Sequence, residues 1–107
     1  MKLWVDDVLP APEGYKWVHS VNEAIWILSH YNENIYFNDP GIRVNEIELI
    51  DIDHDAGIYA QHGGDYIKLL DWLEETGQSY PIHIHSMNSV GVANMKRIIQ
   101  RNGWKEV

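Results

Sequence analysis

Residues 47–55, IELIDIDHD, join an apolar run directly to a dense group of charges. The part from Ile47 to Ile52 is nearly continuous in its apolar character, which is typical of a strand in the middle of a parallel sheet. Asp53, His54 and Asp55 follow at once, where such a strand would leave the sheet. The stretch therefore predicts a central strand whose carboxyl end carries polar chemistry.

Strands and helices alternate along the chain around this segment. Further strands are predicted at residues 2–5, 16–19 and 82–85, and a last edge strand at residues 104–107. The stretch 10–15, PAPEGY, cannot be helical because it holds two prolines and a glycine. This alternation indicates an α/β domain with a mostly parallel sheet.

Three helices are predicted between these strands. Ser20 opens the first with an S-x-x-E capping box completed by Glu23. Asp65 is expected to be the N-cap of the second helix, and the third follows a loop at residues 86–89 and ends at Gly103. The polar stretch from residue 32 to residue 45, with an N-D-P-G turn at 38–41, is expected to hold a small irregular hairpin.

Length and composition narrow the class of protein. A chain of 107 residues with 45 % hydrophobic residues fits one domain, residues 1–107. Eight Lys and Arg against sixteen Asp and Glu give a net charge of −8, which argues against extended nucleic-acid binding. There are no cysteines, and no signal peptide or membrane-spanning run is evident, so we expect a cytoplasmic protein that contacts no membrane.

Polar groups follow three of the predicted strands at their carboxyl ends. Asp6 and Asp7 follow the first strand, Asp53 follows the central one, and His85 lies at the end of the strand after that. Ligands of open parallel sheets bind outside the carboxyl ends of the strands. Because adjacent strands lie about 4.8 Å apart, these groups are predicted to converge on one small ligand.

The three carboxylates are candidates for a divalent cation site. Asp6, Asp7 and Asp53 form an oxygen-rich set that suits Mg²⁺ or Mn²⁺, and a cation would relieve their mutual repulsion. Zn²⁺ is possible if a histidine joins the site. The alternative is that the Asp6–Asp7 pair only caps a turn and stays solvated.

Two histidines beside the carboxylates are candidates for acid and base catalysis. His54 and His85 exchange protons near neutral pH, and Asp55 is placed to orient one of them. The alternatives are a metal ligand or a buried hydrogen-bonding residue. His83 alternates with His85 in PIHIH and is expected to face the other side of the strand, in the core or in an interface.

The loop before the last long helix supplies candidate phosphate ligands. Ser86 and Asn88 would bind phosphate oxygens together with the helix N-terminus. Asn94, expected on the first turn of that helix, would reach the same ligand or face solvent. Plain helix capping by Ser or Asn is the alternative. Asp51, which precedes Asp53 by two residues, is a possible supporting partner of the site.

With these residues in hand, the chain resembles the cyclic-phosphate processing receiver domains, a divergent branch of the response-regulator receiver fold. The stretch 2–15, KLWVDDVLPAPEGY, resembles the family's opening L-D-D-x-R-P-A-P pattern. IDHDAG at 52–57 is similar to its D-H-D-L-G signature, and IHIHSMNSVGVANM at 82–95 to its H-S-x-N-x-x-G-x-x-N-M segment.

The resemblance implies a flavodoxin-like three-layer fold with sheet order 2-1-3-4-5, its first crossover helix replaced here by the PAPEGY loop. It implies that Asp6 and Asp7 match the receiver's acidic metal pair, that Asp53 matches the phosphoacceptor position, and that Ser86 lies near the receiver's conserved hydroxyl. Lys105 does not match the receiver's lysine, which disfavours ordinary phosphorelay signalling.

The leading hypothesis is therefore a metal-dependent phosphoesterase that opens a cyclic phosphate on a small nucleotide or an RNA end. The alternative is a non-catalytic receiver-like module that binds or sequesters a phosphorylated nucleotide or a protein partner. Phosphorelay signalling through Asp53 comes third.

Overall fold

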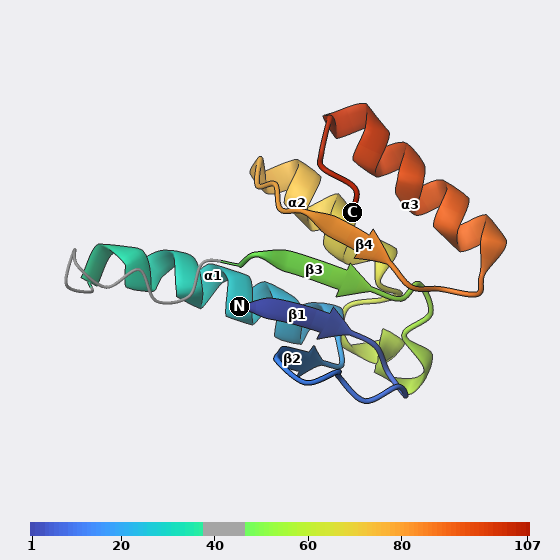
Figure 1. The fold of residues 1–107 in the computed structure, drawn as a ribbon, viewed down its shortest axis with the longest axis horizontal. Helices are drawn as coiled ribbons and strands as arrows, with labels where there is room; N and C mark the ends of the chain where they lie inside the picture. The colour runs from blue at the N-terminus through green and yellow to red at the C-terminus, as the bar shows by residue number, and fades with distance from the viewer. Residues whose placement is uncertain (38–46) are drawn as a thin grey trace.

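The sheet and helices of the computed structural model follow the predicted alternation (Figure 1). The structure describes residues 1–37 and 47–107. In chain order the elements are β1 (Lys2–Val5), β2 (Tyr15–Val18), α1 (Val21–Phe37), β3 (Leu49–Ile52), a 3₁₀ helix η1 (Gly57–His62), α2 (Ile67–Thr76), β4 (Ile82–Ile84) and α3 (Ser89–Asn102).

The four strands form one parallel sheet in the order β2-β1-β3-β4. This order matches the first four strands of the expected flavodoxin-like sheet. The chain therefore adopts an α/β receiver-like fold. Residues 6–14 join β1 to β2 without a helix, which confirms that a loop replaces the first crossover helix. The predicted last strand is reduced to a single parallel bridge between Glu106 and Ile82, on the far side of β4 from β3.

The two faces of the sheet are covered differently. In Figure 1 the strands lie in front of α1 and α2, α3 packs against α2, and no helix crosses the front of the sheet. The described residues therefore form two layers, and the third layer expected from the receiver fold is not formed by residues 1–37 and 47–107. The physical reason is the helix-free first crossover, which leaves this face uncovered.

Alternating strand residues build the core on the covered face. The register pairs Leu3 with Ile50, and Ile50 with Ile82, so these three side chains share one face. All three are fully buried. They pack with other buried aliphatic residues of the strands and helices, among them Val5, Val18, Ile52, Leu28, Leu69, Leu70, Leu73, Met95 and Ile99.

The helix starts differ in detail from the predictions. The Ser20 hydroxyl accepts the N–H of Glu23 at 3.0 Å, as a capping box requires, but the Glu23 carboxylate accepts the N–H of His19 instead of that of Ser20. The prediction for Asp65 is wrong. Tyr66 is the N-cap of α2 and makes no side-chain cap, because the Asp65 carboxylate accepts the N–H of Ala56 at 3.1 Å and so ties down the loop after β3.

The polar stretch from residue 32 starts as helix. Because α1 continues to Phe37, the hairpin predicted for residues 32–45 is wrong over its first part. Its remainder, including the turn predicted at 38–41, lies outside the described residues. Within the described ranges, no helix has the length and apolar character needed to cross a membrane.

Candidate functional site

Three carboxylates meet where β1 and β3 leave the sheet. Asp6, Asp7 and Asp53 each offer an oxygen, and these oxygens lie within 4.8 Å of one another. The Asp53 N–H donates to the Val5 carbonyl at 2.9 Å, which holds the ends of the two neighbouring strands together. The predicted convergence of these strand ends is confirmed.

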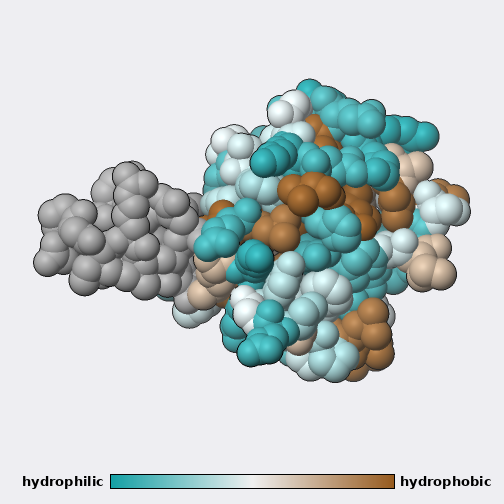
Figure 2. Space-filling view, in the orientation of Figure 1, coloured by the Kyte–Doolittle hydropathy of each residue, from teal (hydrophilic) through white to brown (hydrophobic). Residues whose placement is uncertain are grey.

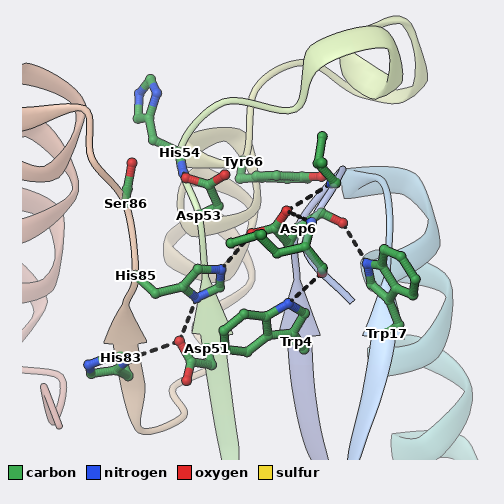
Figure 3. Close-up of polar contacts among 12 residues, drawn as sticks. Trp4, Asp6, Trp17, Asp51, Asp53, His54, Tyr66, His83, His85 and Ser86 are labelled. Atoms are coloured by element: carbon green, nitrogen blue, oxygen red, sulfur yellow. Dashed lines mark hydrogen bonds and ion pairs between the residues drawn. The ribbon is translucent and has the colours of Figure 1, made fainter. Parts of the chain in front are cut away.

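Asp6 is the most constrained of the three. Its side chain is buried, and its Oδ1 accepts the N–H groups of Val8 and Leu9, both at 2.8 Å. Its Oδ2 lies 2.9 Å from Nε2 of His85 (Figure 3). A carboxylate has about four lone-pair positions, so Asp6 keeps roughly one for a further ligand. Asp6 therefore combines the turn-capping role considered as an alternative with a place in the acidic cluster.

The electrostatics of the cluster favour a cation. Burial raises the pKa of Asp7, and the negative charges of Asp6, Asp53 and Asp55 raise it further, against the lowering effect of a backbone hydrogen bond. A divalent cation among these oxygens would reverse that repulsion. Gly57 allows the loop after β3 to lie close to the Asp7 carboxylate, because a Cβ at this position would lie 2.4 Å from Oδ2 of Asp7.

His85 lies between two carboxylates. Its Nδ1 is 2.6 Å from Oδ1 of Asp51, its Nε2 contacts Asp6, and its ring stacks on Trp4 with centroids 3.8 Å apart. Burial alone would lower the pKa of His85, but the hydrogen bonds to Asp51 and Asp6 outweigh burial and raise it. His85 thus bridges the two carboxylates and fixes Asp6, and its protonated ring can donate to both.

The prediction for His83 is wrong. Its Nδ1 lies 2.9 Å from the same Asp51 oxygen that binds His85, so the two histidines share a face of the strand (Figure 3). The reason is geometric, because residues two apart in a strand point to the same side. Burial opposes ionisation of Asp51, but the hydrogen bonds from His85 and His83 lower its pKa. Asp51 is a supporting partner of the site.

His54 belongs to a second cluster. Its Nδ1 lies 2.9 Å from Oδ1 of Asp55, and Nδ2 of Asn88 lies 3.3 Å from that same oxygen. The hydrogen bond from His54 lowers the pKa of Asp55. In Figure 3 the His54 ring points away from Asp6 and His85. The structure therefore joins Asp55 to His54, as predicted for one histidine, but it does not bring the two histidines into contact.

The ring of His54 rests on the first turn of α3. A Cβ on Gly91 would lie 2.4 Å from two of its ring carbons, so only glycine admits the ring in this position. In the part of the chain that the structure describes, Nε2 of His54 makes no hydrogen bond, whereas Nδ1 is committed to Asp55. Nε2 is thus the atom available to exchange a proton.

The side chains predicted to bind phosphate already make hydrogen bonds within the chain. Asn88 is the N-cap of α3, where its Oδ1 accepts the N–H of Gly91 at 2.9 Å, and the hydroxyl of Ser86 accepts the N–H of Asn88 at 3.2 Å. Capping is thus one role of Asn88, and its Nδ2 faces Asp55. Asn94 accepts a hydrogen bond from Arg97 and contacts none of the other described site residues.

Sequence reasoning missed two tryptophans. Trp4 stacks on His85, and Nε1 of Trp17 donates to the main-chain carbonyl of Asp6 at 2.8 Å. A signal was present, because Trp4 lies two residues before Asp6, and in an extended chain residues two apart point to the same side. Trp17 pairs with Trp4 across the sheet.

The fold and site define a class: a receiver-like parallel sheet with an acidic cluster at its carboxyl edge and added histidines beside it. The family model of the cyclic-phosphate processing receiver domain matches residues 1–101, and the chain belongs to this family. Neither a curated protein nor a solved structure matches the chain.

Proposed function

We propose that this domain is a metal-dependent phosphoesterase that opens a cyclic phosphate on a nucleotide or an RNA end. The observation that carries the proposal is the acidic cluster of Asp6, Asp7 and Asp53 next to the His54–Asp55 pair. The first group suits a cation that binds phosphate, and the second suits proton transfer. Membership of a cyclic-phosphate processing family supports the choice of substrate.

The donor set fits a hard cation. Asp7 and Asp53 would supply most of the ligand oxygens, and Asp6 would contribute its remaining lone pair. Both ring nitrogens of His85 are bound to carboxylates, which leaves oxygen donors and favours Mg²⁺ or Mn²⁺ over Zn²⁺. A bound cation would neutralise charge on the phosphoryl oxygens.

The chain's own residues would carry out proton transfer and would position the phosphate. Water adds to phosphorus, one of the two ring P–O bonds breaks, and the ribose oxygen that leaves takes a proton. Nε2 of His54 would accept a proton from the attacking water and return it to the leaving ribose oxygen, while Asp55 holds Nδ1 of the same ring. His85 would act as a positioning residue that holds Asp6. Ser86 and Nδ2 of Asn88 would contact the non-bridging oxygens.

The test is hydrolysis of 2′,3′-cyclic AMP with Mg²⁺ or Mn²⁺, followed by ³¹P NMR. The wild type is expected to produce the ring-opened monophosphate. His54→Ala should lower the rate about 10²–10⁴-fold, the usual contribution of a general acid or base. Asp53→Asn should raise the concentration of Mg²⁺ or Mn²⁺ needed for half-maximal activity, because it removes a carboxylate of the acidic cluster. His30→Ala, which alters an exposed histidine stacked on Trp26, is the matched control.

Two results would contradict the proposal. One is the absence of ring opening with either metal, and the other is full activity of His54→Ala. Calorimetry would then test the alternative function. Tight binding of the nucleotide without turnover would favour the non-catalytic binding module. Labelling of Asp53 by a small phosphodonor would favour a phosphoacceptor.

A further inference from the structure

We infer that the open face of the sheet binds the nucleotides next to the reacting phosphate, so that the preferred ligand is a short single-stranded RNA end and not a free mononucleotide. The inference rests on the proposed function and extends it by naming the substrate class. RNA follows from the chemistry, because a 2′,3′-cyclic phosphate requires the 2′-hydroxyl of ribose.

A row of aromatic and polar side chains crosses the open face. The strand register pairs Trp17 with Trp4, Trp4 with Asp51, and Asp51 with His83, one residue from each of the four strands. Figure 3 shows these four side chains together, on the face that no helix within residues 1–37 and 47–107 covers. Tyr15 adds a second ring beside Trp4, edge-on at 5.9 Å.

This row is continuous with the candidate active site. His85 stacks on Trp4 and contacts Asp6, and Trp17 donates a hydrogen bond to the main-chain carbonyl of Asp6. Trp4 and Asp6 are two positions apart in extended chain, so their Cα atoms lie about 6–7 Å apart. A phosphate held beside the acidic cluster would therefore place the attached nucleoside over the aromatic row.

The chemistry of the face favours bases over a protein surface. Rings with polar neighbours stack on bases and hydrogen-bond to their edges, as in single-strand binding sites. Leu49 is the one aliphatic side chain that the register places here, opposite Lys2. None of the described large hydrophobic residues that are more than half exposed lies in a strand. Figure 2 shows this face as a mixture of hydropathies and not as one continuous apolar patch.

The charge of the chain limits the length of the strand that can bind. A net charge of −8 disfavours long contacts with phosphates, so the terminal phosphate would bind through the cation and only a few nucleotides would follow it. On this face Lys2 is exposed and lies 5.5 Å from the ring of Tyr15. We therefore expect a footprint of a few nucleotides.

The experiment compares kcat/KM for a cyclic mononucleotide and for a tetranucleotide that ends in the same 2′,3′-cyclic phosphate. In the wild type the tetranucleotide is expected to be favoured about tenfold or more, the usual effect of stacking a base on an aromatic side chain. Trp17→Leu should reduce this preference to about onefold to threefold. Trp17→Phe, which loses the bond to Asp6 but keeps a ring, should retain most of it.

The preference is a ratio within each variant, so it is independent of any general loss of activity. If Trp17→Leu does not fold, Tyr15→Leu is the second variant, and it should also reduce the preference. Equal kcat/KM for the two substrates, or a preference that neither variant changes, would overturn the inference while leaving the proposed function intact. Tighter binding of the tetranucleotide without turnover of either substrate would support the inference and overturn the hydrolytic function.

Discussion

The two faces of the sheet differ in the kind of side chain that they carry. The covered face presents aliphatic residues such as Leu3, Ile50 and Ile82, all fully buried against the helices. The open face presents Trp4, Asp51 and other aromatic or ionisable residues. Both patterns come from the same short strands, because alternate residues point to opposite sides.

This difference separates stability from function. The aliphatic face removes apolar area from water, which is the main driving force of folding. The open face is connected to the site through His85. The ring of His85 stacks on Trp4 and is hydrogen-bonded to Asp51 and to Asp6. Substitutions on the covered face should therefore change the free energy of unfolding most, and substitutions on the open face should act on the site.

The largest effect is expected for Ile50→Ala. Ile50 is fully buried in the central strand, and truncating such a residue removes about 2–5 kcal/mol from the free energy of unfolding. Urea denaturation monitored by circular dichroism measures this change. Leu49→Ala, one residue away and pointing to the open face, is the control and should cost less than half as much. Equal losses for the two variants would contradict the assignment of the faces.

His85→Ala tests the connection between the open face and the site. Removing the imidazole leaves the carboxylates of Asp51 and Asp6 buried without this partner, which should cost about 1–3 kcal/mol in metal-free protein. His83→Ala is the control, because its half-exposed ring contacts the same Asp51 oxygen, and it should cost no more than about 1 kcal/mol. Urea denaturation in EDTA compares the two. A smaller loss for His85 than for His83 would contradict the arrangement.

Gly91→Ala moves His54 without altering the sheet. The added Cβ would overlap the imidazole ring, so the ring must move and, under the proposed function, the rate should fall about tenfold or more. Alanine favours a helix over glycine by about 1 kcal/mol, so the helix itself should not be weakened. Histidine NMR signals report the displacement directly. Ser89→Ala, an exposed change on the same turn, is the control, and unchanged His54 signals in Gly91→Ala would contradict the contact.

The covered face was predictable from sequence, whereas the open face was predictable in its existence but not in its side-chain contacts. Continuous apolar strands and the helix spacing were sufficient for the order of elements and for the convergence of Asp6, Asp53 and His85. The contrary expectation for His83 arose from misapplying strand alternation, although the PIHIH pattern itself places both histidines on one side. The PAPEGY loop in place of the first crossover helix indicated that one face of the sheet would be thinner or free, and the described residues leave that face without a helix. The aromatic side chains that line this face were not predicted.

Partners that are neighbours in the chain could be predicted, whereas partners distant in the chain could not. The spacing of Asp55 and His54 suggested a pair, and the structure forms one. Nothing in the sequence indicated that both nitrogens of His85 bind carboxylates, because Asp6 and Asp51 are distant from it in the chain. Such long-range contacts follow from the register of neighbouring strands, which short apolar segments specify only weakly.

The smallest effect is expected at the outer edge of the helical layer, where Arg101 and Asn102 of α3 bind Glu74 of α2. Hydrogen bonds from Arg101 and Asn102 lower the pKa of Glu74, so its contribution is present above its unfolded pKa and is lost as pH falls through the lower folded value. Glu74→Gln should lower the melting temperature slightly at pH 7, and the difference from wild type should vanish in acid. Glu75→Gln, an exposed neighbour, is the control. A difference in melting temperature that persists below pH 3, or an equal effect of Glu75→Gln, would contradict a stabilising ion pair between α2 and α3. The two helices would then be held together by their apolar contacts alone.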